Sequence, residues 1–475
     1  MKIKTGILIL FLSIVIYGQP ESTISYKIDS LFSISGLRSP ATGIQIFNLT
    51  DSSEIYTNNN KILFRPASNL KILTSSAGLL FLGPDYNFET SVFKIGSISD
   101  SVLYGSIYIK GGFDPTFTFD DLDTLIQNIK TSGIKEIRGN LFTDVSSMDS
   151  LYWGHGWMWD DDPSQDAPRL TPLNINENTI KVITSPGQSG GKAMLSLLPP
   201  SEYFEIENHS VTIDTGRAKL KVTRDWLNHS DKIILTGTID TASSTDTTTI
   251  NIGDPVKYFQ QMTLKKLNEI GITFAGISDT ITTPGYADKI YSHKTKYADI
   301  INHMNKESDN LYAEMALRAL GEKFYGTPSS AIKGIKMIDS LIVLALGGSI
   351  DYRIVDGSGL SHYNLISNDM IISVIKFFYY QHPDLYKLLT NSFPVSGTDG
   401  TLKDRLKDEK TKGRVFAKTG TLSAVSTLSG IIGTDNGKEI AFSIFVNNFT
   451  GSAKRARDFQ DNLVKILIDI YQMLP

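Results

Sequence analysis

The sequence contains no cysteine and only seven histidines among its 475 residues. The absence of cysteine excludes disulfides, thiolate nucleophiles, and zinc or iron–sulfur sites built on cysteine. No His-Glu-x-x-His pair occurs, so the helical zinc-protease pattern is absent as well. Lysine and arginine total 46 against 50 aspartates and glutamates, which gives a net charge of −4 without any long basic block. The chain therefore lacks the electrostatic footprint of a nucleic-acid-binding protein, and no nucleic-acid partner is expected.

The length and the apolar content indicate a large folded protein. A chain of 475 residues exceeds one average domain of roughly 100 to 200 residues, so two or three domains are expected. An apolar fraction of 41% excludes a disordered or collagen-like chain.

The first residues have the pattern of a secretory signal peptide. Lys2 and Lys4 precede an apolar run at residues 7–17 that is too short to span a bilayer, and Gly18 follows. We expect residues 1–18 to be removed near Gly18; a buried N-terminal strand or a membrane anchor is the alternative. The mature protein is then expected to be secreted across the inner membrane and to work in the periplasm or cell envelope.

The remaining chain mixes helical and strand patterns, and the mixture changes near residues 88 and 282. Helical patterns dominate outside this interval, whereas short strands with two amphipathic helices dominate inside it. The predicted helices are 68–82, 121–131, 255–269, 309–320, 327–346 and 453–473; the predicted strands include 43–49, 54–56, 211–222, 233–238, 424–434 and 440–447; a flexible loop is predicted at 241–249.

Ser68 and Lys71 are the first candidates for chemistry. They open a predicted helix and, at a spacing of three, share one helical face. A neutral lysine amine can remove the proton of a neighbouring serine hydroxyl, which is the serine–lysine form of nucleophile activation. The Ser-x-x-Lys pattern alone is not specific, because it also begins at Ser91, Ser132, Ser189, Ser330 and Ser373.

Two further motifs follow in the chain. Ser-Asp-Asn at residues 308–310 opens a predicted helix, and Lys-Thr-Gly at residues 418–420 lies against predicted strands near the C-terminal end. Lys-Thr-Gly also occurs at residues 4–6, so the order and the structural context of the motifs carry the signal. Together the three motifs form the signature of class A β-lactamases and penicillin-binding proteins.

With these motifs the chain resembles the class C low-molecular-mass penicillin-binding proteins, which are D-alanyl-D-alanine carboxypeptidases and endopeptidases. The resemblance covers nearly the whole mature chain and includes residues 64–68, 112–115, 157–161, 174–178, 356–361, 397–402 and 418–422. Ser308 lies 240 positions after Ser68, far more than a compact β-lactamase domain inserts. In this family the interval holds two extra domains.

The resemblance implies an α/β (α+β) fold: a β-lactamase/transpeptidase-like domain with an antiparallel sheet and helices, interrupted by a strand-rich insertion. Residues 20–87 and 283–475 would form the catalytic domain. Residues 88–170 and 240–282 would form a second domain, inside which residues 171–239 form a nested third domain.

The resemblance also implies the roles of the catalytic residues. Ser68 would attack the carbonyl between the two terminal D-alanines of a peptidoglycan stem, with Lys71 as the base, and water would hydrolyse the acyl-enzyme. Burial and the nearby cation Lys418 would both disfavour the charged form of Lys71. Ser308 would relay the proton to the leaving amine, and Asn310 would hold the substrate amide.

Residues of the third motif are implied to bind substrate. Lys418 and Thr419 would bind the terminal carboxylate, and the backbone N–H groups of Ser68 and Thr421 would form the oxyanion hole. Gly420 would let the substrate backbone lie close to the strand.

Asp160, Asp161 and His362 are weaker candidates. An acidic residue in the segment of Asp160 and Asp161 faces the stem-peptide side chain in family members; an aromatic plug between domains is the alternative for this segment. Adjacent carboxylates in a loop are more often solvated than metal-bound, so no metal and no cofactor is expected. Family members often carry Arg where this chain has His362, which leaves the preference at the third stem position open.

Peptidoglycan stem peptides and β-lactam antibiotics are the partners that the resemblance implies. A penicillin-binding sensor or scaffold, or a β-lactamase, would share the same fold and motifs and remains the alternative. The long insertion has no use in hydrolysing a small drug, which favours the carboxypeptidase or endopeptidase.

Overall fold

The structure is a computed structural model that describes residues 20–35, 41–216, 219–348 and 350–472. The predicted signal peptide at residues 1–18 lies outside these residues. Within the described part of the chain, no helix is both long enough and apolar enough to cross a bilayer.

A five-stranded antiparallel sheet joins the two ends of the chain. Its strands are β1 (Ala41–Asn48), β2 (Ser53–Asn58), β17 (Val415–Leu422), β18 (Val425–Gly433) and β19 (Glu439–Asn447), in the order β17-β18-β19-β1-β2. The paired strands β1 and β2 confirm the strands predicted at residues 43–49 and 54–56. Strands β18 and β19 are buried along almost their whole length, so the sheet needs cover on both faces.

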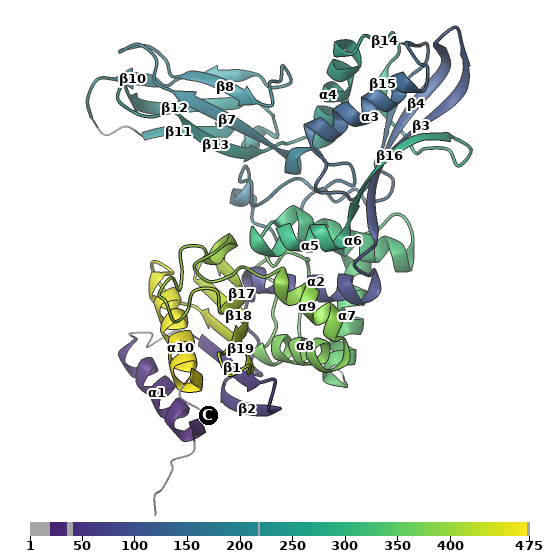
Figure 1. Ribbon diagram of the computed structural model, residues 1–475. Coiled ribbons are helices and arrows are strands. Elements are labelled where there is room, and N and C mark those ends of the chain that lie inside the picture. Colours follow the sequence, from purple (N-terminus) through teal and green to yellow (C-terminus); the bar gives the residue numbers. More distant parts are fainter. Residues whose placement is uncertain (1–19, 36–40, 217–218, 349, 473–475) are drawn as a thin grey trace, which may run out of the picture.

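Helices supply this cover from both sides (Figure 1). The terminal helices α1 (Pro20–Ile34) and α10 (Lys454–Gln472) share one hydrophobic core with the sheet. The core on the opposite face is built by α2 (Leu70–Phe81), α5 (Tyr297–Lys306), α6 (Asn310–Tyr325), α7 (Ala331–Leu346), α8 (Asn368–Gln381) and α9 (Pro383–Asn391). In α10 the buried residues Phe459, Leu463 and Leu467 recur every fourth position, which is the apolar stripe of a helix lying on a sheet.

A second sheet lies beyond the first helical layer. It contains β3 (Asn87–Ser99), β4 (Val102–Gly112), β5 (Glu136–Ile137), β6 (Leu141–Asp144), β14 (Thr273–Phe274), β15 (Ser278–Thr280) and β16 (Asp288–Lys296), and it shares a core with α3 (Phe119–Thr131) and α4 (Pro255–Glu269). Strand β16 pairs with β3 although it follows residue 282, where the insertion was predicted to end. The second sheet therefore continues to Lys296.

A pair of small sheets forms a separate lobe of the insertion (Figure 1). One sheet contains β7 (Thr179–Ser185), β8 (Met194–Leu198) and β13 (Asp246–Asn251); the other contains β9 (Ile206–Asn208), β10 (Val211–Ile213), β11 (Lys219–Arg224) and β12 (Ile233–Asp240). The loop predicted at residues 241–249 is wrong in its second half, because β13 pairs with β7 there. β13 is an edge strand that exposes Asp246 and Thr247 and only partly buries Thr248 and Thr249, so its polar sequence resembles a loop. The single strand predicted at 211–222 is instead the two strands β10 and β11.

Candidate active site

Ser68 lies at the junction of the central sheet and helix α2. A short 3₁₀ turn, η1 (Ala67–Asn69), leads directly into α2, and Ala67 has a positive φ of 47°, which is costly for a residue with a side chain. Asn69 Nδ2 donates to the Lys418 carbonyl at 2.9 Å, and this bond ties the turn to strand β17. Ser68 is therefore held between α2 and β17, and it is partly exposed to solvent.

Lys71 is fully buried one turn further along α2. Its Nζ donates to Ser68 Oγ at 3.2 Å, to Asn310 Oδ1 at 2.5 Å and to the Ser358 carbonyl at 2.8 Å. All three acceptors are neutral. Burial lowers the pKa of Lys71 to about 8, and the charge of Asp309 is the largest effect that opposes this shift. The amine is thus oriented toward Ser68 and loses its proton far more readily than a solvated lysine.

Two buried acids shape the loop that presents the Ser358 carbonyl. Glu314 Oε1 accepts from the backbone N–H groups of Gly357 and Ser358, both at 2.9 Å. Asp356 accepts from the indole of Trp157 at 3.1 Å, and burial, followed by the charge of Glu314, raises the pKa of Asp356 to about 6. Sequence reasoning gave neither acid a role, because each acts on backbone groups that only the fold brings near.

The Ser-Asp-Asn motif opens helix α6 opposite Lys71. Lys418 Nζ donates to Ser308 Oγ at 2.8 Å, and Ser308 has a positive φ of 65°. Burial lowers the pKa of Lys418 well below its usual value, and the charge of Lys71 lowers it further. Burial is the largest cause of the low pKa of Lys71, as expected from the sequence, and the charges of Lys71 and Lys418 repel each other.

Asn310 connects the catalytic helices with the insertion. Its Oδ1 accepts from Lys71, while its Nδ2 donates to the Asp166 carbonyl at 2.6 Å. One N–H of the amide remains for a substrate, since the Nδ2 group carries two hydrogens.

The Lys-Thr-Gly motif lies in β17 beside Ser68. Thr419 Oγ1 donates to Thr401 Oγ1 at 2.7 Å, and Thr421 is exposed. A Cβ at Gly420 would lie 2.2 Å from Thr427 Oγ1 and 3.0 Å from the Pro66 carbonyl oxygen. The expected reason for this glycine was therefore incomplete: the close approach of Thr427 on the neighbouring strand β18, followed by that of Pro66, already requires it.

Asp160, Asp161 and His362 do not share one environment. Asp160 is exposed, whereas Asp161 accepts from the Met158 backbone N–H at 2.8 Å within the 3₁₀ turn η2 (Trp159–Asp161). The electrostatic influence of Asp161 reaches His362. Burial lowers the pKa of His362, and the charge of Arg65 lowers it further. Arg65, which sequence reasoning did not single out, thus places a positive charge close enough to influence His362.

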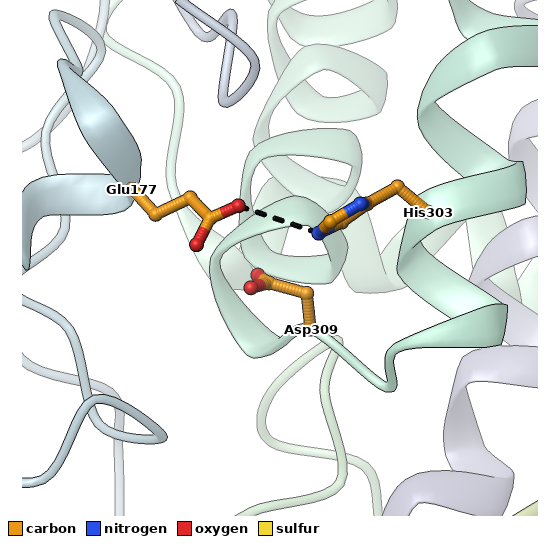
Figure 2. A group of neighbouring side chains, drawn as sticks. All are labelled: Glu177, His303 and Asp309. Atoms are coloured by element: carbon orange, nitrogen blue, oxygen red, sulfur yellow. Dashed lines mark ion pairs between the residues drawn. The ribbon is translucent and has the colours of Figure 1, made fainter. Parts of the chain in front are cut away.

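Glu177, His303 and Asp309 form a titratable cluster next to the Ser-Asp-Asn motif (Figure 2). One ligand atom of each lies within 4.8 Å of the others, and His303 Nε2 pairs with Glu177 Oε1 at 3.3 Å. Burial, followed by the charge of Glu177, raises the pKa of Asp309 to about 6. Among the described residues this is the group whose atoms could hold a metal ion; it joins η3 (Asn176–Asn178) of the insertion to α5 and α6.

The fold and the site together define a serine hydrolase of the transpeptidase and β-lactamase architecture, with a buried lysine beside the nucleophile. Comparison with known proteins identifies the family. Residues 25–469 match the model of the D-Ala-D-Ala carboxypeptidase 3 (S13) family, and the chain belongs to that family. The protein is a serine-type D-Ala-D-Ala carboxypeptidase.

Relatives of known function extend over most of the chain. The chain is 27% identical to D-alanyl-D-alanine carboxypeptidase of Actinomadura sp. (strain R39), over 90% of this chain and 82% of the relative. It is 29% identical to penicillin-sensitive carboxypeptidase A of Dictyostelium discoideum, over 87% of this chain and 84% of the relative. The crystal structure of penicillin binding protein 4 from Haemophilus influenzae superimposes with a TM-score of 0.82 at 25% identity, covering 93% of this chain and 99% of that chain.

Proposed function

We propose that Ser68 forms the acyl-enzyme with peptidoglycan stem peptides. Its Oγ attacks the carbonyl carbon between the two terminal D-alanines, and Lys71 takes the hydroxyl proton. The C–N bond breaks, the terminal D-alanine leaves as an amine after receiving a proton, and water hydrolyses the resulting ester. The observation that carries this assignment is the 3.2 Å contact between a serine hydroxyl and a fully buried lysine whose pKa is about 8.

Ser308 and Lys418 complete the proton path to the leaving group. The hydroxyl of Ser308 accepts from Lys418 Nζ, so a proton can pass from Lys418 through Ser308 to the departing amine. A buried lysine with a depressed pKa also lacks a countercharge, which the terminal carboxylate of the substrate would supply at Lys418 and Thr419. Substrate binding is therefore expected to favour the protonated form of Lys418.

The remaining roles follow from position. The free N–H of Asn310 would hold the substrate amide, while the backbone N–H groups of Ser68 and Thr421 would stabilise the oxyanion. Asp161 and His362 would contact the third stem residue. Cross-linked stems present the same D-alanyl carbonyl, so endopeptidase action on cross-links belongs to the proposal.

We place the reaction in the periplasm or cell envelope, where residues 1–18 would direct the chain. We also keep the domain division as a proposal: a catalytic domain that carries an insertion with a nested lobe. The support for it is that β1 and β2 share a sheet with β17, although the insertion separates them in sequence.

Labelled penicillin G tests the nucleophile directly. Intact-protein mass spectrometry should show one adduct on the wild type, and none on Ser68→Ala. Ser91→Ala is a matched control: Ser91 also starts a Ser-x-x-Lys pattern, but its Oγ contacts Ser292 Oγ in the second sheet, at 2.7 Å. An adduct that persists in Ser68→Ala would refute the assignment.

Turnover separates the carboxypeptidase from the alternatives. Release of D-alanine from a pentapeptide identifies a carboxypeptidase, whereas a sensor or scaffold would become acylated without releasing more than one equivalent. Rapid hydrolysis of penicillin with no D-alanine release would instead favour a β-lactamase.

A further inference from the structure

An aromatic cleft is lined by the segment of the insertion that precedes β7 and by a turn of the nested lobe. The seven residues that line it enclose about 350 Å³: Trp153, Trp159, Asp162, Arg169, Trp226, Leu227 and His229. Trp159 comes from η2, and Trp226 from the 3₁₀ turn η4 (Trp226–Asn228) of the nested lobe. Three of the four tryptophans of the chain therefore border one small cleft.

The tryptophans are placed to receive a ligand rather than to fill a core. The rings of Trp159 and Trp226 lie 5.1 Å apart at an angle of 34°, yet Trp159 remains 69% exposed and its neighbour Leu227 68% exposed. Large apolar side chains left exposed together mark a binding surface more often than chance. The two indole rings, tilted relative to each other, form an apolar surface that is open to solvent.

The charged groups of the cleft already neutralise one another. Asp162 pairs with Arg169 at 2.7 Å and with the buried Arg224, and Asp231 Oδ1 lies 3.8 Å from Arg224 Nε, so two acids balance two cations. Arg169 also stacks over the ring of Trp153, 4.5 Å from its centroid. Because no net charge is left uncompensated, the cleft suits a neutral ligand better than a charged peptide.

One polar atom of the cleft lacks a partner. Arg169 Nε is buried, and no acceptor faces it among the described residues. A buried donor without an acceptor costs about 1–3 kcal/mol, and because water does not reach this atom, a ligand hydroxyl or carbonyl oxygen would pair with it only after the Arg169 side chain shifts toward the cleft. Aromatic surfaces beside such a donor match a sugar ring, whose C–H faces pack on indoles while its oxygens accept hydrogen bonds.

The cleft lies within reach of the catalytic site. Arg169 follows Asp166 by three residues, and the Asp166 carbonyl accepts from Asn310. Three residues span at most about 11 Å, whereas the four residues between the scissile bond and the amino end of a stem peptide span about 14 Å. A stem peptide bound at Ser68 could therefore carry its glycan to this cleft.

We infer that the cleft between Trp159 and Trp226 is a subsite for the glycan of peptidoglycan, which binds N-acetylated sugar rings attached to the stem peptide. This inference rests on the proposed function, because it assigns the glycan part of the same substrate. It goes beyond that function, since the reaction at Ser68 needs only the peptide.

Kinetics on two soluble substrates test the inference. The wild type should hydrolyse a disaccharide pentapeptide with a kcat/KM at least about tenfold above that of the free pentapeptide. Trp159→Ala and Trp226→Ala should reduce this preference to within about threefold while leaving kcat/KM for the free pentapeptide unchanged. Tyr286→Ala, a change of another exposed aromatic residue that does not line the cleft, should keep the full preference. Equal kcat/KM values for both substrates in the wild type would overturn the inference and leave the proposed function intact.

Direct binding keeps the two hypotheses apart if neither substrate is hydrolysed. The β-1,4-linked tetramer of N-acetylglucosamine should alter tryptophan fluorescence of the Ser68→Ala protein in a saturable way, and Trp159→Ala added to this variant should abolish the change. Failure to hydrolyse the free pentapeptide would contradict the proposed function, whereas absence of saturable tetramer binding at millimolar concentration would contradict the glycan subsite.

Discussion

Two regions of the molecule bury a basic side chain completely, and they treat its charge in opposite ways. In the insertion, Arg224 contacts the carboxylate of Asp162, the amide of Asn251 and the carbonyl of Ser230. In the catalytic domain, Lys71 and Lys418 are equally buried, but their hydrogen-bond partners are neutral oxygens.

The difference in hydrogen-bond partners distinguishes a cation that stabilises the fold from one that takes part in the reaction. A buried ion pair that satisfies its hydrogen bonds fixes the arrangement of the chain segments that supply it. A buried lysine without a carboxylate partner instead has its charged form disfavoured, so its pKa falls toward the working pH. The comparison predicts that changes at Arg224 affect folding, while changes at Lys71 affect the reaction.

The largest effect is expected from Lys71→Met. Removing the base should lower the rate of acylation by penicillin about 10²- to 10⁴-fold, since this is the range for loss of a general base. Lys71→Arg should be equally slow, because an arginine keeps its charge and cannot accept the proton. Stopped-flow or quench measurements of adduct formation decide the point, with circular dichroism as a check of folding. Normal acylation by the Lys71→Arg variant would show that only the positive charge matters.

Arg224→Met should act on stability. Removing one partner leaves Asp162 buried with less compensation, which should lower the free energy of unfolding by about 3–5 kcal/mol. Denaturant unfolding followed by tryptophan fluorescence measures this change, because Trp159 and Trp226 lie beside the ion pair. Arg224→Lys retains the charge and should cost less. The acylation rate of the folded fraction should not change, and a large fall in it would break the comparison.

Sequence reasoning located these features unequally. Ser68 and Lys71 were found because their helical spacing places them together and two further motifs follow them in order. Those motifs identified Ser308 before a helix and Lys418 in a strand. The roles of Asp356 and Glu314 were missed because both acids accept from backbone N–H groups of the loop at residues 357–361, and such contacts leave no pattern in the sequence.

The same physical reason limited the prediction of the fold. The β1–β2 hairpin is a local structure: its two strands are neighbours in the sequence, so the local pattern of residues predicts both of them. Strand β16 pairs with β3 about 200 positions earlier, and the polar edge strand β13 depends on β7 for its hydrogen bonds. Non-local pairing of polar strands gives no local signal, so the sequence indicated neither the strand β13 nor the pairing of β16 with β3.

A moderate effect is expected when the negative charge of Asp309 near Lys71 is removed and Lys71 itself is kept. Asp309 raises the pKa of Lys71, so Asp309→Asn should lower this pKa below about 8. Acylation needs the neutral amine; its rate therefore rises with pH up to the pKa of Lys71 and levels off above it. In the variant this rise should move to lower pH, which makes acylation at pH 7 roughly three- to tenfold faster than in the wild type.

Asparagine keeps the helix-capping acceptor of Asp309, which receives the Tyr312 N–H at 3.0 Å, so α6 should still form. Acylation rates between pH 6 and 10 provide the test. Asp85→Asn, at an exposed ion pair with Lys296, is the control and should leave the profile unchanged. A profile in Asp309→Asn that moves to higher pH would contradict the assignment of Lys71 as the base.

The smallest effect is expected at the third stem residue. Burial and the charge of Arg65 both lower the pKa of His362 below the usual value of a histidine, so this side chain is mostly neutral at pH 7 and gains charge only in more acidic solution. A neutral imidazole offers one hydrogen bond where an arginine would offer two charged ones. The wild type should therefore discriminate less than about threefold, at pH 7.5, between stem peptides with a free and with an amidated third side chain. The preference for the free carboxylate should increase as the pH falls toward 5.5, and His362→Arg should make it strong at every pH.

Arg65→Gln tests the alternative that Arg65 recognises the carboxylate. A strong preference of the wild type that does not depend on pH, and that Arg65→Gln removes, would show that Arg65 rather than His362 recognises this group.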